Sequence, residues 1–349
     1  MSTVSSLVPQ LIPLQHTTEQ GSFSLDIDVA IPAKGVTGLF GESGSGKTTL
    51  LRCIAGLEAG SDTDTRAPYE RGIGYVFQEP QLFPHMDVRA NIEYGLKRAG
   101  KARLETDAVV KMLGLGALLS RKPGDLSGGE AQRVAIAAVL LRAPELILMD
   151  EPLASLDQRR KDELLPYLDR LHDELSVPII YVSHSIDEVC RLCDHLILIE
   201  EGRVVADGEL HAMLARLDIP MLAGRNAGTV INATPERHDS DYDLTLFRFS
   251  GGELLVPGKY DSTIPNMRLR IAASDVSICR TRPQKTTILN VLPADIDEIQ
   301  PTGSSTDLVR LAIGDDFLVA QVTRRSVTNL DLRKGDHVFA QVKSVTVRR

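Results

Sequence analysis

A glycine-rich segment, GESGSGKT at residues 41–48, has the composition of a phosphate-binding loop. It fits the spacing G-x-x-x-x-G-K-[ST], in which glycines let successive backbone N–H groups point at phosphate oxygens. Lys47 is expected to reach the β- and γ-phosphates, and the Thr48 hydroxyl to bind Mg²⁺. The residues assigned to nucleotide binding here are Gly41, Glu42, Ser43, Gly44, Ser45, Gly46, Lys47, Thr48 and Thr49.

A second group of residues that could take part in chemistry is the Asp-Glu pair in the segment LILMDEP, residues 146–152, where it follows an apolar run. Asp150 closes this expected strand and would hold Mg²⁺, directly or through water. Two acids at a strand end are usually only a solvated terminus. The phosphate loop upstream makes a metal-binding role the better interpretation.

Strands and helices alternate along the first half of the chain. An apolar strand at Val36–Phe40 enters the glycine loop and a helix at Lys47–Ala55 leaves it, as a phosphate loop requires. This alternation predicts an α/β core with a parallel sheet. Its other expected elements are strands Phe23–Ile31, Ile73–Phe77, Leu146–Asp150, Ile179–Ser183, His195–Glu200 and Arg203–Asp207, and a helix from about Gln158 to Leu175.

A helical region, from about residue 80 to residue 142, interrupts the alternation and predicts an inserted helical subdomain. Within it, LSGGEAQR places Ser127 where a helix N-cap should be, with Glu130 three residues later, which matches a capping box.

Beyond about residue 222, short β-like runs replace the helical pattern. LTLFRFSGGELLVP (244–257) resembles VRLAIGDDFLVAQV (309–322), and RIAASDVSI (270–278) resembles FAQVKSVTV (339–347). Two copies of a five-strand unit predict an all-β C-terminal domain of two small barrel-like, OB-type repeats. The expected divisions are residues 1–222, 223–285 and 286–349.

Composition sets further bounds. The chain has 349 residues, 43% of them hydrophobic, and a net charge of −8, which argues against a nucleic-acid partner held by bulk charge. No apolar run is long enough to span a bilayer, and the first residues do not have the pattern of a secretion signal. Cys190 and Cys193 form C-x-x-C without a second pair, so packing thiols are favoured over a zinc site.

The glycine loop, the LSGGEAQR string and the LILMDEP string together resemble the ATP-binding subunit of ABC transporters, over roughly residues 20–210. The resemblance implies ATP and Mg²⁺ as cofactors and ATP hydrolysis as the activity. It makes Glu151 the base that deprotonates the attacking water, Gln78 a sensor of Mg²⁺ and the γ-phosphate, and His184 a γ-phosphate contact. Phe23 is the candidate for stacking on adenine, although core packing is an equal alternative.

The same resemblance implies a homodimer. Ser127, Gly128 and Gly129 match the signature that caps the γ-phosphate held by a second subunit, and Asp157 matches a loop at the interface between the two subunits. Two chains would then enclose two ATP molecules head to tail. The sequence departs from the family between residues 57 and 71, where relatives usually carry a longer stretch with an extra β-hairpin.

The whole chain resembles the ATP-binding subunit of molybdate importers, on GVTGLFGESGSGKTTLLR, RGIGYVFQEPQLFPHMDVRANI and RIAASDVSI. Leu82, Phe83, Pro84 and Met86 would form an apolar docking surface for a membrane permease, which works with a substrate-binding protein. This implies a peripheral location on the cytoplasmic face of the inner membrane.

In the tail, TTILNVLPADI (286–296) and AQVKSVTV (340–347) resemble the start and end of a molybdate-binding fold, with Thr287, Asn290, Lys343 and Ser344 as candidate oxyanion ligands. Leu289 stands where oxyanion-binding relatives carry arginine, so an oxyanion sensor and a purely structural barrel both stay open. Tungstate and sulfate are the alternative substrates. A soluble ABC ATPase acting on ribosomes or DNA is the less favoured class, because neither heptads nor a second phosphate loop is present.

Overall fold

The computed structural model describes residues 11–20, 23–58, 64–96, 104–174, 176–264 and 266–348. Backbone contacts divide the chain into two compact units, residues 1–208 and 209–349, which are described separately. The shortened segment 57–71 lies partly outside the described residues.

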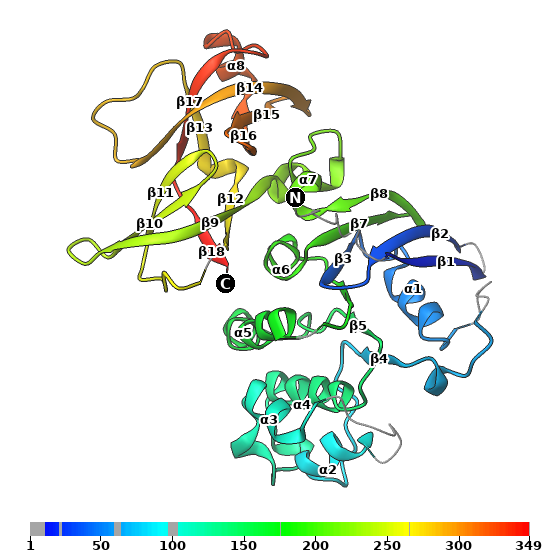
Figure 1. Cartoon of the computed structure of the whole chain (residues 1–349). Helices are drawn as coiled ribbons and strands as arrows, with labels where there is room; N and C mark the ends of the chain where they lie inside the picture. Colours follow the sequence, from blue (N-terminus) through cyan, green and yellow to red (C-terminus); the bar gives the residue numbers. More distant parts are fainter. Residues whose placement is uncertain are drawn as a thin grey trace, which may run out of the picture. The chain divides into compact units, whose positions relative to one another are not determined.

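The N-terminal unit contains an eight-stranded sheet in the order β1-β2-β8-β7-β3-β6-β5-β4 (Figure 1). β3 pairs in parallel with β6 and β7, and β5 pairs in parallel with β4 and β6, whereas β1 and β2 are antiparallel. The expected α/β core is therefore confirmed. The strands are β1 (Leu11–Gln20), β2 (Phe23–Pro32), β3 (Val36–Phe40), β4 (Ile73–Val76), β5 (Leu146–Asp150), β6 (Ile179–Val182), β7 (His195–Glu200) and β8 (Arg203–Glu209).

Two sets of helices accompany this sheet. The first set follows individual strands: α1 (Lys47–Ile54), α5 (Gln158–Glu174) and α6 (Ile186–Leu192). The second set lies together apart from the middle of the sheet (Figure 1): α2 (Val88–Glu93), α3 (Thr106–Met112) and α4 (Gly128–Leu140). Three strands, β3, β5 and β6, are buried along their whole length, which explains their continuous apolar runs.

Arg71 fastens the segment that follows α1. Its guanidinium donates to the carbonyls of Cys53 and Ile54, at the C-terminal end of α1, and also to the carbonyls of Asp64 and Arg66. A cation at a helix C-terminus satisfies carbonyls that have no partner inside the helix and complements the helix dipole. This side chain therefore connects the short segment to the helix that begins at the phosphate loop.

The C-terminal unit is formed by two five-stranded sheets, β11-β10-β9-β12-β18 and β13-β17-β14-β15-β16 (Figure 1). Its strands are β9 (Gly228–Asp239), β10 (Leu244–Phe249), β11 (Gly252–Pro257), β12 (Met267–Ala272), β13 (Val276–Cys279), β14 (Asn290–Thr302), β15 (Thr306–Ile313), β16 (Asp316–Thr323), β17 (His337–Val342) and β18 (Thr346–Arg348). Two short helices, α7 (Leu210–Leu214) and α8 (Arg324–Asn329), complete it.

The two sheets exchange one strand each. β18, from the end of the chain, pairs with β12, and β13 pairs with β17. Both exchanged strands come from the RIAASDVSI and FAQVKSVTV segments, so the internal repeat in sequence corresponds to reciprocal pairing. The sheets consequently cross the division expected at residues 285 and 286, and their inner faces share one apolar core that includes Phe247 and Leu311.

Residues 209–222 pack with the C-terminal unit rather than with the nucleotide-binding core. Leu217 belongs to a buried cluster with Ala227, Ala273, Leu308 and Val319. His211 Nδ1 lies 2.9 Å from the carbonyl oxygen of Val230. The boundary between compact units therefore falls upstream of residue 222, because the segment after α7 contributes Leu217 to a buried cluster of the second unit.

Candidate functional site

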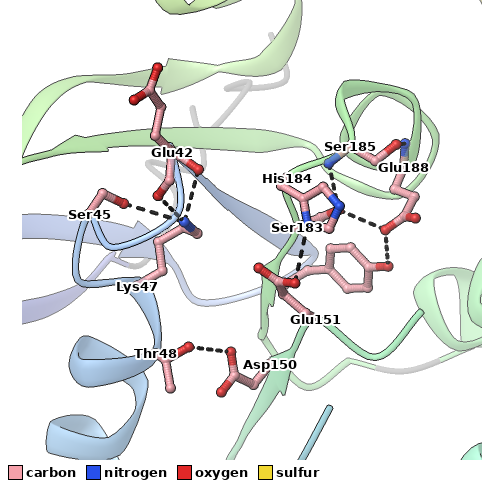
Figure 2. Close-up of polar contacts among 12 residues, drawn as sticks. Glu42, Ser45, Lys47, Thr48, Asp150, Glu151, Ser183, His184, Ser185 and Glu188 are labelled. Atoms are coloured by element: carbon pink, nitrogen blue, oxygen red, sulfur yellow. Dashed lines mark hydrogen bonds and ion pairs between the residues drawn. The ribbon is translucent and has the colours of Figure 1, made fainter. Parts of the chain in front are cut away.

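Lys47 lies at the centre of the glycine loop. Its ammonium donates to the carbonyls of Gly41 (2.9 Å) and Glu42 (2.7 Å) and to the hydroxyl of Ser45 (3.4 Å), as Figure 2 shows for Glu42 and Ser45. Burial lowers the pKa of Lys47, and the negative charges of Glu151 and Asp150 act in the opposite direction. The three bonded partners are neutral, so the positive charge remains for an anion such as phosphate.

Gly46 must be glycine for both conformation and space. Its φ of 103° lies in the left-handed region, and it is the N-cap of α1. A Cβ at this position would lie 2.7 Å from the Phe23 ring. The loop therefore turns directly against Phe23, the candidate for stacking on adenine.

A pocket of about 430 Å³ opens over this loop. It is lined by loop and α1 residues, by Phe23 and by Glu151. An anion bound here would meet the unsatisfied N–H groups and the positive dipole end at the N-terminus of α1. The pocket thus combines an anion-binding backbone, a buried ammonium and an acid that is separated from them in sequence.

Thr48 lines the pocket and is bonded to Asp150, so two oxygen-bearing side chains lie together beside it. The Thr48 hydroxyl donates to Asp150 Oδ1 at 2.9 Å (Figure 2), and the Tyr75 hydroxyl donates to Asp150 Oδ2 at 2.9 Å. Mg²⁺ prefers oxygen ligands of this kind beside substrate phosphates. The pair fits the predicted metal site, and Tyr75 is an orienting residue that the sequence reading missed.

Replacing Tyr75 by Phe is expected to weaken Mg²⁺ binding. The variant removes the donor to Asp150 Oδ2 and leaves the ring, and outer-sphere partners of this kind are worth roughly 10- to 100-fold in metal affinity. We expect the half-saturating Mg²⁺ concentration for ATP hydrolysis to rise within that range, while metal-free binding of a fluorescent ATP analogue stays unchanged. Tyr69→Phe, at an exposed ring, is the matched control. An unaltered Mg²⁺ requirement would remove Tyr75 from this role.

Glu151 follows Asp150 at the end of β5 and meets His184. His184 Nδ1 lies 3.2 Å from Glu151 Oε2 (Figure 2). The Glu151 backbone has a positive φ of 46°, and its N–H donates to the carbonyl of Val182 on the neighbouring strand. A non-glycine residue in this conformation is a strained position of the kind found at functional sites. The turn aims the carboxylate at the pocket rather than along the strand.

Gln78 lies just after β4 and is exposed. The preceding carbonyl, of Phe77, accepts a hydrogen bond from the buried Gln132 side chain of α4 at 3.2 Å. The end of β4 is therefore tied to the helical subdomain. This bond holds the backbone next to Gln78, whose side chain is not among those that line the pocket over the glycine loop.

The signature residues begin α4, away from this pocket. Ser127 caps the helix: its hydroxyl accepts from the Glu130 N–H, and the Glu130 carboxylate accepts from the Ser127 N–H. Asp157 similarly accepts from the Arg160 N–H at the start of α5. The pocket lining contains none of Ser127, Gly128, Gly129 or Asp157. These groups are not brought onto the phosphate loop of their own chain.

Three of the four candidate oxyanion ligands are exposed, and the fourth, Asn290, is buried and bonded to the backbone. The Asn290 amide is bonded on both sides to the backbone of Leu255, accepting at 2.7 Å and donating at 3.0 Å. Asn290 therefore fastens β14 to β11, which favours a structural role for its side chain. Thr287, Lys343 and Ser344 are exposed, and the Lys343 N–H donates to the carbonyl of Asp275.

Curated relatives match nearly the whole chain. It is 46% identical over 354 residues to molybdenum import ATP-binding protein ModC 1 of Azotobacter vinelandii, covering 96% of this chain and 98% of the relative. The chain belongs to the family of molybdenum import ATP-binding proteins. A ModC protein of Methylococcus capsulatus is 48% identical over 340 residues, covering 93% of this chain and 96% of the relative.

Matches to parts of the chain agree with this family. The ABC transporter family matches residues 25–154, and the TOBE domain family matches residues 286–348. Among solved structures, CbiO1 from Clostridium perfringens, part of the ABC transporter complex CbiONQ, is 28% identical with a TM-score of 0.51, covering 60% of this chain and 92% of that chain. The expected ABC ATPase core with a following all-β region is confirmed.

Proposed function

We propose that this chain is the ATP-hydrolysing subunit that energises import of molybdate through a partner permease. The observation that carries the chemistry is one open pocket lined by Lys47, Thr48 and Glu151, with Asp150 bonded to Thr48 and His184 bonded to Glu151. The observation that carries the substrate class is the near full-length similarity to molybdenum import ATP-binding proteins.

In the proposed reaction, the glycine loop and Lys47 would hold the β- and γ-phosphates of ATP, and Thr48 and Asp150 would hold Mg²⁺. The metal ion supplies charge neutralisation for the leaving phosphate oxygens. Glu151 accepts a proton from the attacking water, and its bond with His184 fixes the direction of the carboxylate. His184 would contact the γ-phosphate, and Gln78, which lies just after β4, would contact Mg²⁺ and the γ-phosphate.

We further propose that two copies of the chain complete each other's sites. The signature helix α4 has an exposed N-terminus with Ser127 and Gly128 at its start. Backbone N–H groups at such a terminus bind phosphate, yet these lie outside the pocket of their own chain. A two-fold dimer places them over the ATP of the partner subunit, with Asp157 at the interface.

A groove near β4 and α4 is the proposed permease contact. A pocket of about 230 Å³ there is lined by Phe83, Tyr94 and Arg142 among others, and Phe83 is 39% exposed. Asn91 holds the loop before α2 by bonding both the N–H and the carbonyl of Phe83. A fixed loop with exposed apolar side chains suits a short helix of a partner.

Attachment of the chain to a membrane is proposed to depend on that partner. In the described ranges, every helix is too short or too polar to cross a bilayer. The proposed location is the cytoplasmic face of the inner membrane, with a substrate-binding protein delivering the anion on the other side.

Reconstitution tests the function. The chain is co-purified with its permease in vesicles, and ATP hydrolysis is measured with a substrate-binding protein loaded with molybdate, tungstate or sulfate. Stimulation by molybdate, with accumulation of the anion inside, supports the proposal. Stimulation by sulfate alone would assign a sulfate importer, and hydrolysis indifferent to permease and anion would favour a soluble ABC ATPase.

A further inference from the structure

A buried polar cluster lies directly behind His184. Glu188, in the first turn of α6, has a side chain that is 8% exposed. Its Oε2 accepts hydrogen bonds from the hydroxyls of Ser183 (2.7 Å) and Tyr181 (3.0 Å), and its Oε1 accepts from Lys161 Nζ (2.8 Å). None of these residues was singled out by the sequence patterns. The catalytic scheme above does not use them.

The cluster determines the backbone turn that carries His184. The Ser183 hydroxyl donates to Glu188 and also accepts from the Ser185 N–H at 3.0 Å, so it bridges the residues on either side of His184 (Figure 2). The imidazole itself is 57% exposed, and Glu151 is its bonded partner toward the pocket. The direction of an exposed side chain with one such partner depends on how firmly its backbone is held.

Lys161 connects the same cluster to the start of α5. Its N–H donates to the carbonyl of Asp157, so it stands one helical turn after the residue proposed to lie at the dimer interface. Its ammonium reaches across to α6 and pairs with Glu188. One short chain of bonds therefore joins Asp157, Lys161, Glu188, Ser183 and the His184 turn.

The ion pair between Lys161 and Glu188 is largely buried, unlike an exposed surface ion pair. Lys161 and Glu188 have side chains that are 19% and 8% exposed, and removal of one partner would leave the other charged and poorly solvated. Burial, with the charge of Glu188, also raises the pKa of Tyr181 well above its ordinary value, so this hydroxyl stays a proton donor to the carboxylate. Each donor in the cluster points at Glu188.

We propose that Lys161 and Glu188 are positioning residues that couple the dimer-interface segment at Asp157 to the orientation of His184. This inference rests on the proposed ATPase function and deepens it. Closure of the dimer around ATP would act on Asp157, and the Lys161–Glu188 pair would transmit that contact to the turn that places the imidazole against Glu151 and the γ-phosphate.

A second ion pair between the same helices provides a matched control. Arg191 on α6 bonds Asp169 on α5 through Nε, at 3.1 Å to both carboxylate oxygens, and through Nη2. Its side chains are 15% and 10% exposed, comparable with the first pair. It joins α5 to α6 away from the His184 turn, so it reports the cost of weakening helix packing alone.

The test compares Lys161→Met and Glu188→Gln with Arg191→Met and Asp169→Asn in the full chain. We expect the first two to lower kcat roughly 10- to 100-fold with little change in KM for ATP, as for a group displaced by about 1 Å. Lys161→Arg is expected to restore most of the rate. The control variants should lower the melting temperature by a similar amount and keep kcat within about twofold of the unmodified chain, because they sit outside the bonded path.

Amide hydrogen exchange supplies a readout that does not need hydrolysis. The Ser185 N–H should exchange faster in Lys161→Met than in the unmodified chain, and its exchange rate should not change in Arg191→Met. The reason is that only Lys161→Met disturbs the Ser183 hydroxyl to which this N–H is bonded. The proposed coupling is overturned if the Ser185 N–H exchanges equally in Lys161→Met and Arg191→Met. It is also overturned if variants of the two ion pairs lose kcat equally. If a single variant of Lys161 or Glu188 does not fold, kcat and Ser185 N–H exchange are measured instead in the double variant Lys161→Met/Glu188→Gln, which removes both charges. Absence of ATP hydrolysis by the unmodified chain would reject the ATPase function. Hydrogen exchange at the Ser185 N–H would still test the proposed coupling.

Discussion

A chain with Glu151→Gln is expected to bind ATP normally and to hydrolyse it about 10²–10⁴-fold more slowly, the range for loss of a general base. The amide has the shape of the carboxylate but does not accept a proton from water. Because ATP would persist between the two subunits, the variant should accumulate as an ATP-bound dimer. Single-turnover hydrolysis, a fluorescent ATP analogue and light scattering measure these three properties.

Glu163→Gln is the matched control for this experiment. Glu163 lies on α5, its side chain is 60% exposed, and it pairs with Arg159 at the surface. We expect its hydrolysis rate and dimer population to equal those of the unmodified chain. Turnover by Glu151→Gln near that of the control would exclude Glu151 as the base and direct attention to His184.

Ser127→Arg and Lys47→Ala are each expected to lose hydrolysis, and a mixture of the two chains is expected to regain part of it. Removing one preorganised charge or donor from such a site costs on the order of 10²–10³-fold in rate. In a mixed dimer both defects fall on the same composite site. The other site then combines an intact phosphate loop with an intact signature.

A second mixture of chains is the control for the mixing experiment. Lys47→Ala chains mixed with Lys47→Ala/Ser127→Arg chains have no intact phosphate loop and should stay inactive. Recovery in the first mixture above both parents, at ratios where native mass spectrometry detects mixed dimers, supports sharing of the sites. Mixed dimers without recovery would contradict it.

The phosphate loop could be predicted from sequence because its bonds are local. Lys47 bonds groups no more than six positions away, so spacing alone displays the arrangement. Tyr75 is different, since its partner Asp150 is 75 positions away and becomes a neighbour only because β4 pairs with β5. Residue types along the chain do not state which strands are adjacent.

Other features were hidden for related reasons. β1 was not predicted, and its buried face includes His16, which interrupts an apolar alternation. The link between Lys161 and Glu188 spans 27 positions and two helices, and each residue alone has the pattern of a solvated charge. The hairpins of the C-terminal repeats were visible as similar segments, whereas the pairing of β13 with β17 depends on which copy each strand joins.

The exchange of strands in the C-terminal unit has a consequence for the order of folding. The first sheet acquires its edge strand, β18, from residues 346–348, near the C-terminal end of the chain. Hairpins β10–β11 and β15–β16 pair segments that follow each other directly in sequence, whereas the pairing of β18 with β12 joins Arg268 to Arg348, 80 positions apart. Non-local pairing of this kind is slow to form. We therefore expect the sheet β11-β10-β9-β12-β18 to complete its pairing only after its local hairpins have formed.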